Sequence, residues 1–148
     1  MLHQSSHLGD EFLLDTPVQR INYSYEAINF KSAVTLGEFR LYAGGERIVH
    51  HDPADLKIWS AQQGFEWIST AKYFGDAIAP LAAVDVQEHQ ETHWHASFSV
   101  RAGIELVNPE HTRRRIQFLL QYFHGYNPNG QFYRERAAWL GAGLHVYF

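Results

Sequence analysis

Three polar residues near the start of the chain have the types and spacing of a nucleophile with its base. His3, Ser5 and His7 alternate along the sequence, and alternate residues of a β-strand share one face. Neighbouring side chains on that face lie about 6.6 Å apart, so the His3 imidazole can reach the Ser5 hydroxyl as a general base. The pattern predicts a serine nucleophile; the structural alternative, which we favour, is a set of polar strand-end residues that hydrogen-bond a loop.

The third member of such a site has to come from the strand that pairs with this one. We expect a hairpin register in which Asn22 lies opposite Ser5 and Ser24 lies opposite His3. Asn22 or Glu26 would then orient the His3 ring, as the acidic or amide member of a triad does.

Histidines recur at positions that we assign below to one end of a sheet. His93 and His95 share a face, and carboxylates such as Glu88 and Glu91 lie close by in sequence. A divalent metal could bind there, but no ligand spacing repeats a known site, so a solvated, weakly pH-sensitive rim is the favoured interpretation and no cofactor is expected. The histidines concerned are His7, His50, His51, His89, His93, His95 and His124.

Composition excludes several classes of protein. The 148 residues are 45% hydrophobic and 15% aromatic, yet no apolar run approaches the roughly 18 residues of a transmembrane helix. The absence of cysteine excludes a disulfide scaffold and a thiolate metal site. A net charge of -4 is too small to imply a nucleic-acid partner.

The elements that must position these residues are strands. Apolar and polar residues alternate with period two, most clearly over residues 94–106, where every even position from Trp94 to Leu106 is apolar. No helical period occurs between the alternating segments. We therefore predict one domain, residues 1–148, that forms an antiparallel up-and-down sheet. Its predicted segments are residues 1–8, 20–36, 39–50, 58–70, 79–87, 94–106, 115–124 and 136–148.

The last segment, residues 136–148, indicates what kind of sheet this is. Its even positions from Ala138 onward are apolar, its odd positions are small or semi-polar, and the sequence ends on Phe148. This resembles the closing strand of a bacterial outer-membrane β-barrel, where that strand is also the signal for the barrel-assembly machinery. We therefore predict a transmembrane β-barrel of about eight strands in the bacterial outer membrane.

Aromatic residues fit the two interfaces of such a membrane. Trp59 and Trp67 are eight residues apart on one face, which separates them by roughly 20 Å in depth on a tilted strand, close to the ~25 Å apolar band between two aromatic girdles. The predicted girdle residues are Trp59, Trp67, Trp94, Tyr122 and Phe148.

The opposite face would line the interior. We expect Arg101 to form ion pairs with Glu105 and Asp85 that fill a narrow barrel, because eight strands leave an interior just wide enough for side chains. His145 lies on the same predicted lumen face. The alternative is a soluble lipocalin-type barrel, whose apolar face points inward, but the polar face carries too few charges to solubilise an exterior.

Two features of the sequence limit the barrel interpretation. No export signal is present in the sequence as given, and the first segment is only about eight polar residues, so it is a short partner for the closing strand. An outer-membrane protein with lipid and lipopolysaccharide as neighbours would therefore need further sequence upstream.

Longer motifs add a family resemblance. Residues 5–12 (SSHLGDEF), 20–23 (RINY) and 127–133 (NPNGQFY) resemble the C-terminal half of a bacterial envelope family, the domain of unknown function 1207. The resemblance implies the C-terminal part of a larger barrel and assigns no catalytic residue. The pair of His3 and Ser5 is in turn similar to that of outer-membrane phospholipase A and the lipid A deacylase, which implies a lipid hydrolase as the alternative to a structural, solute-binding or lipid-binding barrel.

Overall fold

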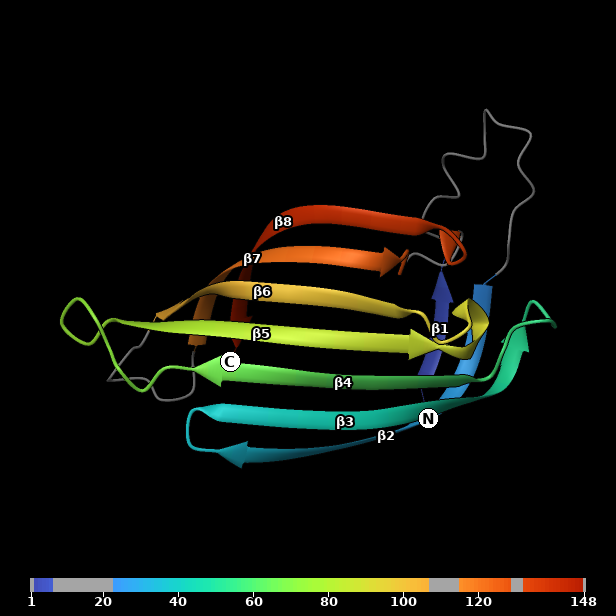
Figure 1. Cartoon of the computed structure of the whole chain (residues 1–148), viewed down its shortest axis with the longest axis horizontal. Coiled ribbons are helices and arrows are strands. Elements are labelled where there is room, and N and C mark those ends of the chain that lie inside the picture. The colour runs from blue at the N-terminus through green and yellow to red at the C-terminus, as the bar shows by residue number, and fades with distance from the viewer. Residues whose placement is uncertain (1, 7–22, 107–114, 129–131, 148) are drawn as a thin grey trace.

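The structure is a computed structural model, and its strands follow one another in a single sheet (Figure 1). It describes residues 2–6, 23–106, 115–128 and 132–147, with the backbone alone for residues 2–6. A single turn of 3-10 helix, η2 (Gln90–Thr92), follows the fifth strand. The strands are β1 (Leu2–Ser6), β2 (Tyr23–Leu36), β3 (Phe39–Asp52), β4 (Trp59–Ile68), β5 (Ile78–His89), β6 (Ala96–Leu106), β7 (Arg115–Tyr126) and β8 (Arg136–Tyr147).

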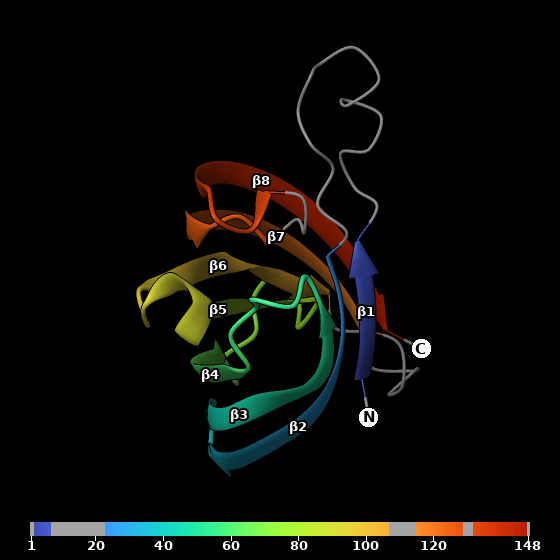
Figure 2. The same ribbon diagram turned by 90° about the vertical axis from the view of Figure 1, so that its right-hand side faces the viewer.

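Each strand pairs antiparallel with the next, in the order β1 to β8. The predicted all-β up-and-down sheet is therefore confirmed, with seven long strands and the short β1. Figure 2 shows that the sheet curls around a concave space and that β1 crosses near its open side. Among the described residues, β1 pairs with β2 and β8 pairs with β7 but not with β1, so the predicted closure of the barrel is not observed. The five residues of β1 offer little pairing surface to the twelve of β8.

The predicted strand boundaries hold to within a few residues, and the late start of β6 has a local cause. β6 begins at Ala96 rather than at Trp94, because His93 and Trp94 have φ values of 55° and 61°. The Trp94 amide donates to the His89 carbonyl, which closes a turn instead of extending the strand. The pairing of β2 with β3 shifts register at a bulge between Glu26 and Ala27.

The two faces of the curved sheet differ in polarity. Tyr42 on β3 reaches across β4 to Asp85 on β5, 2.6 Å from hydroxyl to carboxylate, a contact between non-adjacent strands that only the concave face allows. The convex face carries exposed apolar side chains, with Leu140 76% and Phe30 73% exposed. Its large exposed members are Ile28, Phe30, Val34, Leu36, Phe39, Leu41, Trp59, Phe65, Val84, Val100, Phe118, Leu120, Tyr122, Leu140, Leu144 and Val146.

Buried apolar side chains are few in the described residues, and four of them form a cluster at one end of the sheet. Tyr25, Ala27, Leu56 and Tyr133 form one cluster, with Tyr23 and Ile48 packed against it. Leu56 belongs to the loop after β3 and Tyr133 to the segment before β8, so loops supply half of this cluster. Among the described residues, no large side chain is fully buried on the concave side of the sheet. No helix in the described part of the chain is long and apolar enough to cross a membrane.

One glycine on the concave face is required by a side chain that crosses it. Gly64 pairs with Tyr42 on one side and with Asp85 on the other. A Cβ at position 64 would overlap the Tyr42 ring, and the hydrogen bond to Asp85 prevents that ring from moving aside.

We predict that Gly64→Ala lowers the free energy of unfolding by about 1–3 kcal/mol, the usual cost of overpacking. Gly45→Ala is the control, because an added Cβ there meets its nearest neighbour at an ordinary 3.5 Å and should leave stability equal or slightly higher. Denaturant titration followed by tryptophan fluorescence measures both. Equal stability of the two variants would contradict the assigned role of Tyr42.

Candidate functional site

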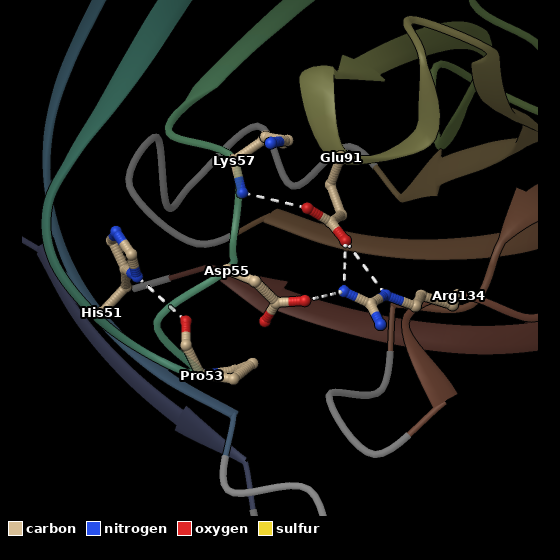
Figure 3. Close-up of polar contacts among 6 residues, drawn as sticks. All are labelled: His51, Pro53, Asp55, Lys57, Glu91 and Arg134. Carbon is tan, nitrogen blue, oxygen red and sulfur yellow. Dashed lines mark hydrogen bonds and ion pairs between the residues drawn. The ribbon is translucent and has the colours of Figure 1, made fainter.

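Three connections meet at one end of the sheet and are joined by Arg134. Its Nε donates to Glu91 Oε1 at 3.0 Å, and a terminal nitrogen donates to Asp55 Oδ2 at 2.9 Å. Glu91 also accepts the backbone N–H of Lys57 at 2.9 Å. Figure 3 shows Asp55 from the loop after β3, Glu91 from η2 and Arg134 from the segment before β8 pointing toward one another. We call Asp55, Glu91, Arg134 and the Lys57 amide the loop clamp.

The loop after β3 has its own internal contacts, which orient it toward the clamp. The Leu56 amide donates to the Pro53 carbonyl at 3.2 Å, and His51 Nδ1 lies 3.0 Å from the same oxygen. The Leu56 side chain is then 4% exposed, packed in the cluster with Tyr25. Burial of this one leucine holds the loop against the end of the sheet.

The electrostatics of the clamp follow from its contacts. The hydrogen bond from Arg134 holds the pKa of the Asp55 carboxyl below its usual value, and hydrogen bonds to Asp55 and Glu91 raise the pKa of Arg134. The Glu91 side chain is 12% exposed, whereas those of Asp55 and Arg134 are more than half exposed. Water therefore screens the Asp55 pair more than the Glu91 pair.

The predicted lumen residues Asp85, Arg101, Glu105 and His145 all lie on strands, at concave-face positions of the register. Asp85 accepts hydrogen bonds from Tyr42, Gln62 and Gln87 at 2.6, 2.6 and 2.9 Å. A cluster of neutral donors, rather than a cation, therefore satisfies this carboxylate.

The predicted ion pairs of Arg101 with Glu105 and Asp85 are not among the ion pairs of the described residues. Within the described structure, Glu105 instead accepts from Gln117 at 2.7 Å and lies 3.8 Å from Arg115. Arg101 and Glu105 are four residues apart on one extended strand, about 13 Å, which is too far for contact. The well-formed ion pair of this face joins Arg40 to Glu66 on the neighbouring strand at 2.9 Å.

The predicted girdle residues lie in different settings. Trp59 and Tyr122 are on the convex face, 47% and 42% exposed. Trp67 shares that face, and its indole N–H donates to Glu38 in the β2–β3 turn at 2.8 Å. Trp94, 49% exposed, stands in the turn before β6 rather than on a strand. Phe148 lies outside the described residues.

The predicted triad is described only in its backbone register. Ser5 pairs opposite Ser24 and His3 opposite Glu26, so the expected register, with Asn22 opposite Ser5, was wrong by two residues. Asn22 lies outside the described residues. Nothing is described of the side chains of His3 and Ser5, and their catalytic role stays a prediction.

The histidines of the predicted rim do not converge. His51 contacts the Pro53 carbonyl, His95 contacts the Thr92 carbonyl at 2.6 Å, and His124 accepts from Arg136 at 3.1 Å. No group of three or more His, Asp or Glu side chains suited to a metal ion occurs in the described ranges. His7 lies outside them.

The sequence did not reveal the loop clamp. Asp55 and Arg134 are 79 residues apart and Glu91 is 43 residues from Arg134, in connections without any period. The cue that the sequence does offer is the cluster of turn residues before each of the three segments, which identifies loops but not their partners.

These observations define a class: an antiparallel, up-and-down β protein with an apolar convex face, a polar concave face and one end covered by joined loops. The chain belongs to the DUF1207 family, described as a protein of unknown function, whose match spans residues 1–148. The family resemblance expected from the motifs is thereby confirmed. No curated protein and no solved structure matches the sequence.

We predict that Arg134→Gln loosens the loop after β3, because Glu91 loses its cation and Asp55 its donor. The loss is about 0.5–1.5 kcal/mol for a partly exposed site, which makes local opening roughly two- to tenfold more frequent. Peptide-resolved hydrogen–deuterium exchange of the segment containing Lys57 measures it. Arg136→Gln is the control, since Arg136 contacts His124 and not the clamp; equal exchange in both variants would contradict the clamp.

We also predict that the clamp weakens in acid. The folded pKa of Asp55 is below its unfolded value of about 3.9, so its contribution is complete above that pH and is lost as the pH falls through the folded pKa. Exchange of the Lys57 segment should therefore accelerate below about pH 4, beyond the intrinsic pH dependence of exchange. Asp55→Asn should remove most of this acceleration, and an unchanged profile in that variant would exclude Asp55 as its source.

Proposed function

We propose that this chain forms the wall of a bacterial outer-membrane β-barrel that interacts with lipid on its convex face and with small solutes on its concave face. The observation that carries the proposal is the polarity of the two faces. Apolar side chains project outward from the curved sheet, while Asp85, Arg101 and Glu105 belong to the face turned inward. Lipid is the solvent that suits such an exterior.

The alternative of a soluble lipocalin-type barrel requires the opposite arrangement. A soluble barrel covers its apolar side chains with the sheet and turns charges to water. Soluble monomers rarely expose a contiguous apolar patch of more than a few hundred Å², whereas the exposed apolar residues here span β2 to β8. Leu120, 61% exposed, and Leu144, 60% exposed, are typical of them. The polarity therefore favours a lipid-facing exterior.

The contacts on the concave face suit a narrow, structural barrel and not a wide channel. Tyr42, Gln62 and Gln87 meet at Asp85 across three strands, and the loop clamp covers one end. In the proposed setting the loop end lies outside the cell, the turn end in the periplasm, and β8 is the strand read by the barrel-assembly machinery. Lipid and lipopolysaccharide surround the convex face.

The proposal predicts that a charge on the convex face impairs membrane insertion. Leu140→Arg should cost about 2–4 kcal/mol near the bilayer midplane and so reduce the fraction that folds into lipid vesicles. Gln121→Arg is the matched control, because Gln121 pairs with Gly141, next to Leu140 but on the concave face. Heat-modifiable electrophoretic mobility in an outer-membrane fraction reports folding; a wild-type product that stays monomeric in water without detergent would overturn the proposal.

A second candidate is a lipid acyl hydrolase that uses Ser5 and His3. The observation that favours it is the register, which pairs His3 with Glu26. A residue that orients a histidine base has to come from such a neighbouring position, and Glu26 has the carboxylate for it. Ser24 and Glu26, the register partners of Ser5 and His3, alternate along β2 with the buried Tyr25 and Ala27, and in the proposed barrel their face is the one turned toward lipid. In such a site Ser5 would be the nucleophile, His3 the base and Glu26 the group that orients the base.

The hydrolase candidate predicts release of fatty acid from phospholipid or lipid A by the folded protein. Ser5→Ala should abolish it, a loss of several orders of magnitude, while Ser6→Ala, the adjacent hydroxyl, should retain it. Titration of released fatty acid measures the rate. Equal rates in Ser5→Ala and wild type would reject the hydrolase and leave the barrel proposal untouched.

A further inference from the structure

A volume of about 290 Å³ opens on the concave face toward the turn end of the sheet, the end opposite the loop clamp. Every strand from β3 to β8 contributes at least one residue to its wall, because the curvature of the sheet turns these strands around one space. One water needs only about 10–15 Å³ in this measure. The volume therefore has room for a small solute.

The wall of this volume is rich in guanidinium groups. Arg40 from β3, Arg101 from β6 and Arg115 from β7 line it, and Glu66 is the one carboxylate among its described lining residues. Glu105 approaches Arg115 to 3.8 Å from outside the wall. With Glu105 included, the guanidiniums still outnumber the carboxylates. Like charges around one space repel one another, and an anion bound among them would offset that repulsion.

The three guanidiniums retain most of their donors. Arg40 donates from one terminal nitrogen to Glu66 at 2.9 Å, and a guanidinium has several further N–H groups. Arg115 comes no closer than 3.8 Å to Glu105, which is too long for a hydrogen bond. Arg101 takes part in no ion pair among the described residues. Each of the three can therefore donate to a ligand.

The neighbours of Arg101 explain why it has no ion pair. Its register partners are Ala83, which has no acceptor in its side chain, and Gln121. The Gln121 amide is directed to Ser99, to which it donates at 2.7 Å. Asp85, outside the wall of this volume, is satisfied by three neutral donors. Arg101 is thus an exposed cation on the concave face without a carboxylate of its own.

Aromatic rings restrict the other two guanidiniums. Arg40 lies over the Tyr42 ring, 5.3 Å from its centroid, and Arg115 lies over the Tyr147 ring at 5.0 Å. Arg101 acts electrostatically on the Tyr42 hydroxyl, a neutral group that does not balance its charge. Arginines stacked in this way lose less side-chain freedom when they bind a ligand.

Apolar side chains form another part of the same wall. Leu81 and Leu119 line the volume and are each 7% exposed. Apolar groups beside a cation exclude water from one side of it, which strengthens its attraction for an anion. The site therefore combines positive charge, free donors and partial shielding from water.

We propose that this volume binds a small solute through a phosphate group, with Arg101 as its main partner and Arg40 and Arg115 as further donors. Guanidinium groups match phosphate oxygens in both geometry and charge. Donors from three strands suit a tetrahedral group with several free oxygens, whereas a single arginine can satisfy a planar carboxylate. The inference rests on the proposed function, because it names the class of solute for the concave face.

The test is isothermal titration calorimetry of the full chain, folded in a non-ionic detergent, at about pH 8, where phosphate is a dianion, and at constant ionic strength. Inorganic phosphate and glycerol 3-phosphate are the probes, and acetate is the planar, monovalent comparison. At least one phosphate probe should bind, and acetate should bind at least tenfold more weakly. Tighter binding of glycerol 3-phosphate would identify a phosphorylated solute as the ligand, and tighter binding of inorganic phosphate would identify the free ion.

Two results would overturn the proposal: no binding of either phosphate probe at about 50 mM, or acetate binding as tight as that of phosphate. Heat-modifiable mobility of the same sample reports the barrel fold separately. A protein that folds in lipid but binds no phosphate would therefore refute this inference and leave the lipid-facing exterior intact. A water-soluble protein would be titrated in the same way without detergent.

Arg101→Gln should weaken binding of the phosphate probe by roughly tenfold or more, as expected for loss of a charged hydrogen-bond donor. Arg136→Gln is the control, because Arg136 begins β8 and Tyr147 ends it, which separates Arg136 from the pocket wall by about 36 Å. Its affinity should be unaltered. Equal affinities of Arg101→Gln and wild type would overturn the assignment, as would equal weakening in both variants.

Thermal unfolding separates binding from a structural role of Arg101. Since Arg101 has no ion pair among the described residues, Arg101→Gln should keep or raise the melting temperature without phosphate. It should also reduce the rise in melting temperature that phosphate produces. A lower melting temperature without phosphate, with the phosphate-induced rise unchanged, would show a structural role and overturn the assignment.

Discussion

Antiparallel pairing of each strand with the next is the constraint on which every other feature depends. Residues paired across strands share a face, so the register that sets Tyr42, Gly64 and Asp85 side by side also determines the polarity of both faces. A slip of one residue in any strand would turn its apolar side chains inward. Curvature then brings the inward side chains together and spreads the outward ones apart.

The polar network of the concave face takes the place that an apolar core has in most domains. Asp85 is satisfied by three neutral donors, and Arg40 pairs with Glu66 on the next strand. Stability therefore depends on the hydrogen-bonded ladders and on these rows more than on burial of large side chains. The Tyr42 ring also explains why this face has a glycine at position 64, where an added Cβ would meet that ring.

The loop end combines burial with electrostatics. Leu56 and Tyr133 enter from two connections and pack with β2, and Arg134 joins those connections to η2. The same guanidinium covers the Tyr133 ring. Arg134 thus holds the loops that cover this end of the sheet and also packs on the Tyr133 ring beneath them. Loss of Arg134 would affect both contacts.

Period-two alternation in the sequence was enough to predict the strands, their order and the residues that share a face, because side chains of any strand alternate whatever the strand packs against. The family followed from local motifs. Only the tertiary structure decided which face is convex, that Glu105 and Asp85 pair with groups other than Arg101, and that Asp55, Glu91 and Arg134 meet. Those outcomes depend on curvature and on contacts between distant loops, and neither leaves a periodic trace in the sequence.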